Sequence, residues 1–72
     1  MEQLVYIAVG KKIRSIRKNQ KLTQRDLALL LGVSQSSISN LEKGVYPVTL
    51  HVLIKVAAAL HTSMKIIFSE ID

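Results

Sequence analysis

The sequence predicts a small all-α domain, and three observations support that prediction. Apolar residues recur at spacings of three and four along most of the chain, which is typical of helices with one buried face. A hydroxyl residue precedes each of four such runs, where it caps a helix start, at Thr23, Ser34, Thr49 and Ser63. Glycine follows two runs, at Gly32 and Gly44, where a helix must end. We expect a single domain over residues 1–72.

The composition favours a helical core and a polyanionic partner. Hydrophobic residues make up 49% of the chain but aromatic residues only 4%, so the core consists of aliphatic side chains. The absence of cysteine excludes a disulfide scaffold and thiolate metal sites. The net charge is +5, and the basic residues concentrate between positions 11 and 25. Nucleic acid suits that density, although a solvated helix face explains it equally well.

The first predicted helix covers residues 4–19. Its inward side contains Tyr6, Val9, Gly10, Ile13, Ile16 and Arg17. Residues 4–9 are apolar nearly all round, so we expect them to contact more than the core of the domain. A second copy of the chain and the C-terminal tail are the two candidate partners for this segment.

Residues 23–44 predict two short helices joined by a tight turn, Gln24–Leu31 and Gln35–Lys43. The inward residues are Leu27, Ala28, Leu30 and Leu31 of the first, Val33 of the turn, and Ile38 and Leu41 of the second. The outward residues of the second helix are Gln35, Ser36, Ser37, Ser39, Asn40 and Lys43. Most are short and uncharged and both donate and accept hydrogen bonds, whereas an ordinary solvated face is richer in Glu and Lys.

A loop at residues 44–47 leads to a helix that runs from the cap at Thr49 to about Leu60. Its predicted inward stripe is Leu50, Leu53, Ile54, Ala57 and Leu60. The C-terminal segment is ambiguous. Met64, Ile67, Phe68 and Ile71 have helical spacing, but Met64, Ile66 and Phe68 alternate as in an edge strand.

Catalytic patterns are missing from the sequence. The five acids form no pair on one helix face, and His51 and His61 have no acidic or thiol partner nearby. No glycine-rich phosphate loop is present, and so short a chain has little room for a substrate pocket. We expect no enzyme activity, no cofactor and no bound metal. Residues 4–9 are too short to span a membrane and lack the flanks of a signal peptide, so we expect a cytoplasmic protein without membrane association.

Two short helices joined by a glycine-containing turn are a known way to place one helix in the DNA major groove, although a plain helical hairpin needs the same inward residues. Over roughly residues 10–68 the chain resembles the Cro/repressor-type (XRE-like) helix-turn-helix domains. The matching motifs are Gly10-x-x-Ile13-Arg14-x-x-Arg17, Leu22-Thr23-Gln24-x-x-Leu27-Ala28 and Gly32-Val33-Ser34-Gln35-x-x-Ile38-Ser39-x-x-Glu42-x-Gly44. The resemblance implies a five-helix lambda-repressor-like fold and favours a helix at residues 63–68.

The resemblance also implies roles for particular residues. Base edges would be contacted by Gln35, Ser36 and Asn40, with Ser37 and Ser39 as weaker candidates. DNA phosphates would be contacted by Gln24, Arg25, Lys43 and Thr23. Arg17 and Glu42 would form an internal ion pair between the first and third helices, so Arg17 would not contact DNA. Pro47 stands one place earlier than the usual proline of the family, which leaves the geometry of that loop open.

The sequence therefore predicts a regulator of transcription, more specifically a repressor, that binds double-stranded DNA as a homodimer on a palindromic operator. The dimer contact would use the C-terminal tail or the start of the first helix. Three alternatives fit the same sequence: a DNA-binding antitoxin with a toxin partner, a restriction–modification controller protein, and a protein-interaction domain without DNA binding.

Overall fold

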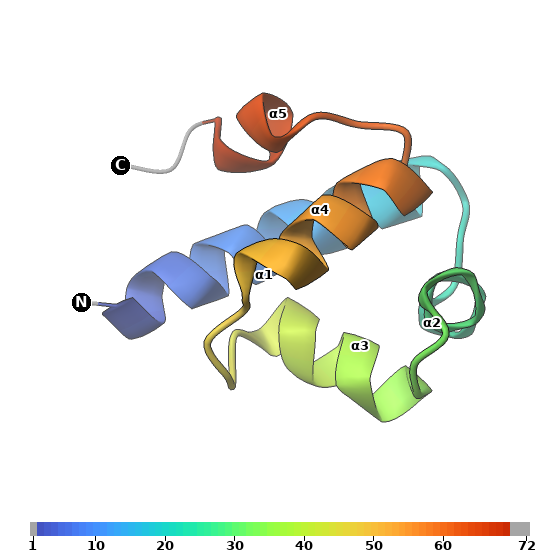
Figure 1. Ribbon diagram of the computed structural model, residues 1–72, viewed down its shortest axis with the longest axis horizontal. Coiled ribbons are helices and arrows are strands. Elements are labelled where there is room, and N and C mark those ends of the chain that lie inside the picture. Colours follow the sequence, from blue (N-terminus) through green and yellow to red (C-terminus); the bar gives the residue numbers. More distant parts are fainter. Residues whose placement is uncertain (1, 70–72) are drawn as a thin grey trace.

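The computed structural model describes residues 2–69, which form five α-helices (Figure 1). They are α1 (Glu2–Asn19), α2 (Gln24–Leu31), α3 (Gln35–Lys43), α4 (Leu50–Ala59) and α5 (Met64–Phe68). The predicted bounds of α2 and α3 are confirmed. The C-terminal segment is a helix, and residues 2–69 contain no strand. The prediction for Ile71 lies outside the described residues.

The helix ends are determined by local hydrogen bonds. Each of the four predicted caps accepts a hydrogen bond at its side-chain oxygen from the backbone N–H three residues later. At the start of α2 the bond is reciprocal, because the carboxylate of Asp26 accepts from the backbone N–H of Thr23. Gly32 and Gly44 both have φ of 69°, a left-handed conformation that costs a glycine little. The predicted caps and stops are therefore confirmed.

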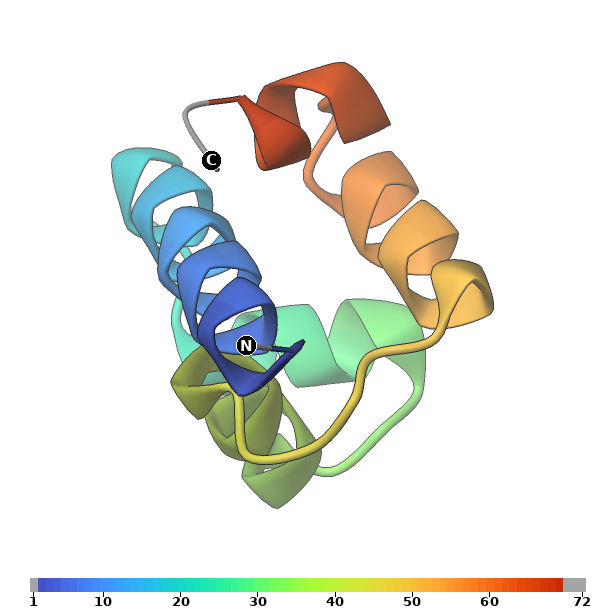
Figure 2. The ribbon, with the colours of Figure 1, turned by 90° about the vertical axis from the view of Figure 1, so that its left-hand side faces the viewer.

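All five helices contribute to one core. Figure 2 shows α1 on one side and α4 with α5 on the other, with α2 lying between them and α3 below. The fully buried large side chains are Val9, Ile13, Leu27, Ile38, Val56, Leu60 and Ile67. Because α2 and α3 pack on this core from one side, the outer face of α3 is left at the molecular surface.

Two glycines allow α3 to approach α1 at backbone distance. A Cβ atom on Gly10 would lie 2.5 Å from the backbone oxygen of Glu42, and one on Gly44 would lie 2.5 Å from the Cα atom of Ile7. Neither position has space for a side chain, since the nearest atoms belong to backbone. The C-terminal end of α3 is thus held directly against the backbone of α1.

Four predicted inward residues are exposed. They are Leu30 of α2, Val33 of the turn after it, and Leu50 and Ile54 of α4. The other members of the stripe predicted for α4, Leu53, Ala57 and Leu60, are buried as expected, and Val56 is buried as well. The prediction was wrong for Leu50 and Ile54 because α4 is apolar on most sides, so several faces satisfy the helical spacing, and packing against α2 and α5 selects one of them.

Two negative findings apply to residues 2–69. No helix there is both long and apolar enough to cross a membrane. No three His, Cys, Asp or Glu side chains of these residues lie close enough together to hold a metal ion.

Candidate nucleic-acid interface

The outer side of α3 forms a shallow polar hollow together with the start of α2. The residues that line it are Gln24, Gln35, Ser36, Ser39 and Asn40, which we call the recognition face. Gln35 and Ser36 are exposed, whereas Ser39 and Asn40 are half-buried. None of the five carries a charge, and amide and hydroxyl groups both donate and accept hydrogen bonds. The structure therefore brings together four of the five side chains predicted to contact bases.

Ser37 lies apart from the recognition face. Its hydroxyl is 2.9 Å from the hydroxyl of Ser34, and its backbone N–H donates to the same Ser34 oxygen. The side chain is exposed, but it is engaged with the cap of α3 and lines a different cavity. These contacts fit the weaker role that the sequence predicted for Ser37.

A second hollow adjoins the recognition face and is lined in part by exposed, positively charged side chains. Arg14, Lys43, Gln24 and Ser39 line it, with the buried side chains of Arg17 and Glu42 at its base. Arg14 and Lys43 are both exposed, so two positive charges stand beside the polar hollow. Arg14 is a functional candidate that was not predicted from the sequence. Its position three residues before Arg17 on α1 placed it on the same helix face and was the signal that could have found it.

Thr23 and Arg25 line neither hollow, although both are exposed at the start of α2. The hydroxyl oxygen of Thr23 accepts a hydrogen bond from the backbone N–H of Asp26 at 3.0 Å. Both residues stay predicted phosphate contacts at the edge of the interface.

The predicted ion pair between Arg17 and Glu42 is present and fully buried. Arg17 Nε lies 2.6 Å from one carboxylate oxygen of Glu42, and Arg17 Nη2 lies 3.0 Å from the other. Arg17 Nη1 also donates to the backbone oxygen of Leu22 at 2.7 Å. The hydrogen bond to Glu42 raises the pKa of Arg17, although burial acts in the opposite direction. The guanidinium thus connects α1, the loop before α2, and α3.

Gln24 extends this buried network to the recognition face. Its Nε2 atom donates to Glu42 Oε1 at 3.1 Å, so Gln24 braces α3 through the buried carboxylate. The second amide N–H and the amide oxygen of Gln24 remain available at the surface. Within the described residues every buried side-chain nitrogen and oxygen has a hydrogen-bond partner. The network therefore holds α3 at a fixed orientation without leaving an unpaired charge.

Comparison with known proteins agrees with this geometry. A helix-turn-helix family model, HTH_3, matches residues 13–67. The chain is 38% identical over 64 residues to the immunity repressor protein of Bacillus phage phi105, a match that covers 89% of this chain and 44% of that protein. It is 42% identical over 41 residues to the antitoxin PezA of Streptococcus pneumoniae, covering 57% of this chain and 26% of the antitoxin. The matches span less than half the length of either relative.

The chain also resembles proteins of known structure. The clp gene regulator ClgR of Corynebacterium glutamicum is 33% identical with a TM-score of 0.86, over 89% of this chain and 83% of that chain. The restriction-modification controller protein C.AhdI of Aeromonas hydrophila is 30% identical with a TM-score of 0.83, over 88% of this chain and 96% of that chain. The chain belongs to the helix-turn-helix family HTH_3, and the resemblance to XRE-like domains is confirmed.

Proposed function

We propose that this helix-turn-helix regulator binds double-stranded DNA with α3 in the major groove and represses transcription as a homodimer on a palindromic operator. The recognition face is the observation that supports this proposal most strongly. A single Gln or Asn side chain can make two hydrogen bonds to the edge of an adenine, and a Ser hydroxyl can hydrogen-bond to several bases. No catalytic step and no cofactor enter the proposal, and DNA as the target implies a cytoplasmic site of action.

The cations beside the recognition face supply the affinity that does not depend on sequence. Arg14 and Lys43 stand at its margin, and Arg25 lies at the start of α2. Each Lys or Arg that neutralises a phosphate releases bound counterions, so the logarithm of the affinity falls linearly with the logarithm of the salt concentration. A salt titration of DNA binding is expected to show a steep negative slope. A flat titration would contradict binding to DNA.

Two observations support the dimer: the small size of the recognition face and the exposed apolar side chains of α1 and α5. A single domain presents few base-contacting side chains, and a two-fold dimer doubles them on a palindrome. Leu4 and Val5 are 63% and 45% exposed at the start of α1, and Ile66 and Phe68 are 49% and 40% exposed on α5. The helix α5 packs on α1, and these segments lie at the same end of the molecule (Figure 1). The two interfaces predicted separately thus combine into one candidate surface.

Sedimentation equilibrium tests the dimer directly. The unmodified chain should sediment as a dimer, and Ile66→Asp should sediment as a monomer with unchanged helical circular dichroism. Leu30→Asp is the matched control, because Leu30 is a comparably exposed apolar residue on α2. It should remain dimeric. A wild-type chain that stays monomeric even with its operator DNA would contradict the dimer.

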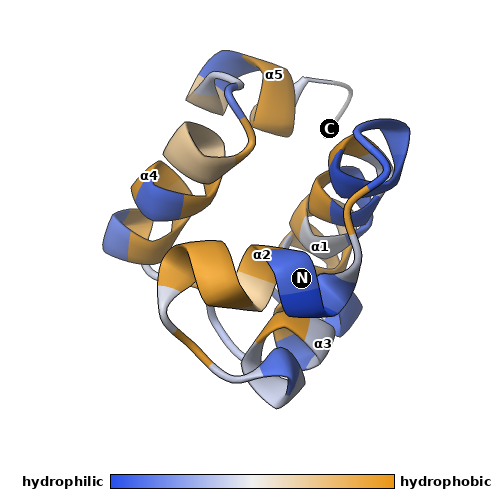
Figure 3. Cartoon of the chain, turned by 90° about the vertical axis from the view of Figure 1, so that its right-hand side faces the viewer, coloured by the Kyte–Doolittle hydropathy of each residue, from blue (hydrophilic) through white to orange (hydrophobic). Residues whose placement is uncertain are grey.

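The match to the phage immunity repressor supports repression, and the match to PezA supports a second candidate, a DNA-binding antitoxin. An antitoxin needs a surface for its toxin in addition to the recognition face. Leu29 and Leu30 are 73% and 60% exposed in the second half of α2, which is the hydrophobic half in Figure 3. Co-expression with the protein encoded by the adjacent gene separates the two candidates. An antitoxin should form a stoichiometric complex, whereas a repressor acting alone should form none.

A further inference from the structure

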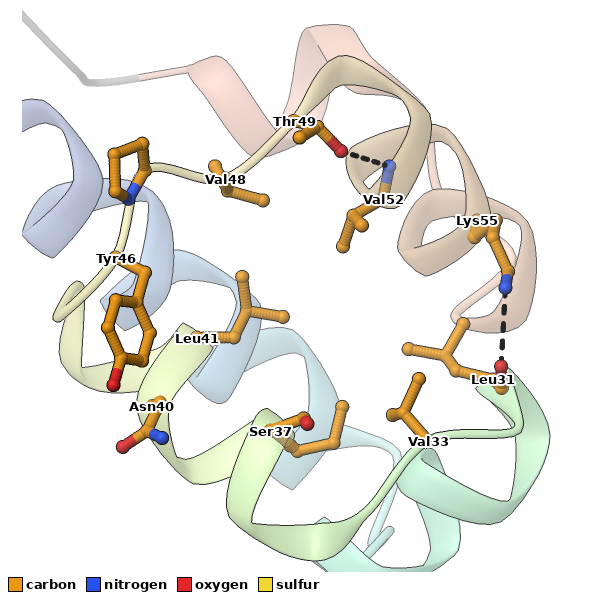
Figure 4. Close-up of a pocket in the computed structure, with 12 residues that line it drawn as sticks. Leu31, Val33, Ser37, Asn40, Leu41, Tyr46, Val48, Thr49, Val52 and Lys55 are labelled. Carbon is orange, nitrogen blue, oxygen red and sulfur yellow. Dashed lines mark hydrogen bonds between the residues drawn. The ribbon is translucent and has the colours of Figure 1, made fainter.

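An apolar cavity lies between α3, α4 and the loop that joins them (Figure 4). Its volume is about 310 Å³, at the lower end of the range of small-molecule sites. In Figure 4 the side chains of Leu31, Leu41, Val48 and Val52 converge on the same open space. The helix α3 packs on α1 and α2, and on the α4 side this cavity takes the place of helix-to-helix packing. One side of α3 therefore faces a cavity rather than another helix.

The polar groups around the cavity define the chemistry of a ligand. Among residues 2–69, Lys55 is the one charged residue that lines it, and its Nζ donates to the backbone oxygen of Leu31 at 3.3 Å. An ammonium group has three donors, so two remain for a ligand. The oxygen of Thr49 accepts from the backbone N–H of Val52, which leaves its hydroxyl proton free to donate. These free groups are donors, and no acidic residue in the described part of the chain lines the cavity.

We propose that this cavity binds a small carboxylic acid with an aromatic or branched apolar body, and that the bound acid weakens DNA binding. The apolar walls would enclose the body, and Lys55 would pair with the carboxylate. Ser37 and Asn40 of α3 line the same cavity, so the ligand's body would lie beside the helix that approaches the DNA, with its carboxylate at Lys55 near the end of α2. A bound acid neutralises one cation and repels phosphates. This antagonism rests on the proposed function, but binding of the acid does not.

Nuclear magnetic resonance titration of the whole chain without DNA tests the site. The probes are 3-phenylpropionate and its neutral counterpart 3-phenylpropionamide. The acid should shift the backbone amide signals of residues that line the cavity and bind about fivefold more tightly than the amide, as expected for a solvent-exposed ion pair. Lys55→Met should remove the preference for the acid. Lys65→Met, the same change at an exposed position on α5, should retain it.

Three results would overturn the site: no shifts, equal affinities for the acid and the amide, or an unchanged preference in Lys55→Met. Equal affinities would indicate a plain apolar cleft suited to a partner's side chain. In a second arm, saturating 3-phenylpropionate should weaken binding to duplex DNA about two- to fivefold at fixed ionic strength. Unchanged DNA affinity would contradict the antagonism. A chain that binds no DNA at all would refute the proposed function, while the acid titration would still decide the cavity.

Discussion

A surface helix usually buries uncharged side chains and exposes charged ones, whereas α3 buries a charged side chain and exposes mostly uncharged ones. The side that faces α1 contains the carboxylate of Glu42, buried with Arg17 and Gln24. The side that faces solvent contains Gln35, Ser36 and Asn40, which are uncharged. A buried ion pair adds little net stability compared with apolar packing, but losing one partner is costly. We interpret the inner side as the device that orients α3 and the outer side as the device that recognises DNA.

The contrast between the two sides of α3 predicts which residues affect stability and which affect DNA binding. Changes on the inner side should lower the melting temperature and alter DNA binding only through displacement of α3. Changes on the outer side should alter DNA binding and leave the melting temperature unchanged.

Glu42→Ala should have the largest effect, because it leaves the buried guanidinium of Arg17 without its carboxylate partner. We expect the free energy of unfolding to fall by about 3–5 kcal/mol. In a domain of this size each kcal/mol corresponds to roughly 4–8 °C in melting temperature, measured by circular dichroism. The double variant Arg17→Met with Glu42→Leu removes both charges and should recover much of the loss. A Glu42→Ala melt within a few degrees of wild type would contradict a structural role for the pair.

Gly10→Ala should destabilise the domain by about 1–3 kcal/mol, as overpacking of a close contact does. The new Cβ atom would lie 2.5 Å from the backbone oxygen of Glu42, so α3 would have to move away from α1. This loss should appear although alanine favours helix formation by about 1 kcal/mol over glycine. Ser15→Ala, at an exposed position of the same helix, should show no loss in a denaturant melt. Equal stability of the two variants would mean that the close approach of α1 and α3 is not rigid.

Gln35→Ala should weaken binding to operator DNA by roughly 1–3 kcal/mol, with little change on random DNA and none in the melt. The matched variant is Arg14→Ala, on the charged margin of the recognition face. It should weaken binding to both kinds of DNA alike and reduce the salt slope by about one per protomer. Equal losses on operator and random DNA for Gln35→Ala would reassign Gln35 to the DNA backbone.

Asp26→Asn should have the smallest effect, present near neutral pH and vanishing under acid conditions. The backbone N–H of Thr23 donates to the carboxylate and lowers the pKa of Asp26 below its ordinary value of 3.8. A lowered pKa in the folded state stabilises the fold above the ordinary value, and this contribution is lost as the pH falls through the folded pKa. Between about pH 6 and about pH 3, wild type should therefore lose more stability in urea melts than Asp26→Asn. Parallel losses would show that the capping carboxylate does not contribute.

The helix-turn-helix was predictable because its signals are local. Thr23, Ser34, Gly32 and Gly44 determine where helices start and stop through hydrogen bonds to their own neighbours, and the structure has those bonds and turns. The pair of Arg17 and Glu42 spans 25 residues. It followed from the family resemblance, since spacing on a single helix contains no such information.

The mispredicted positions share a physical cause. Leu30 lies in a run of apolar residues, and Leu50 and Ile54 lie on a helix with few polar residues, so periodicity identifies no single inward face. Packing among helices distant in sequence decides which side is buried. The cavity beside α4 has the same origin, because it depends on how α3 and α4 fail to meet. The exposure of Leu50 and Ile54 and the cavity could not be derived without the assembled fold.

Selection of bound sequences from a random pool of duplex DNA tests the central claim most directly. It examines recognition by α3, dimer symmetry and half-site spacing in one measurement. We expect enrichment of an inverted repeat with half-sites about 10 base pairs apart, and loss of the enriched bases when the selection is repeated with Gln35→Ala. Enrichment of no sequence, or of one unaffected by Gln35→Ala, would contradict the assignment of α3 as the recognition helix.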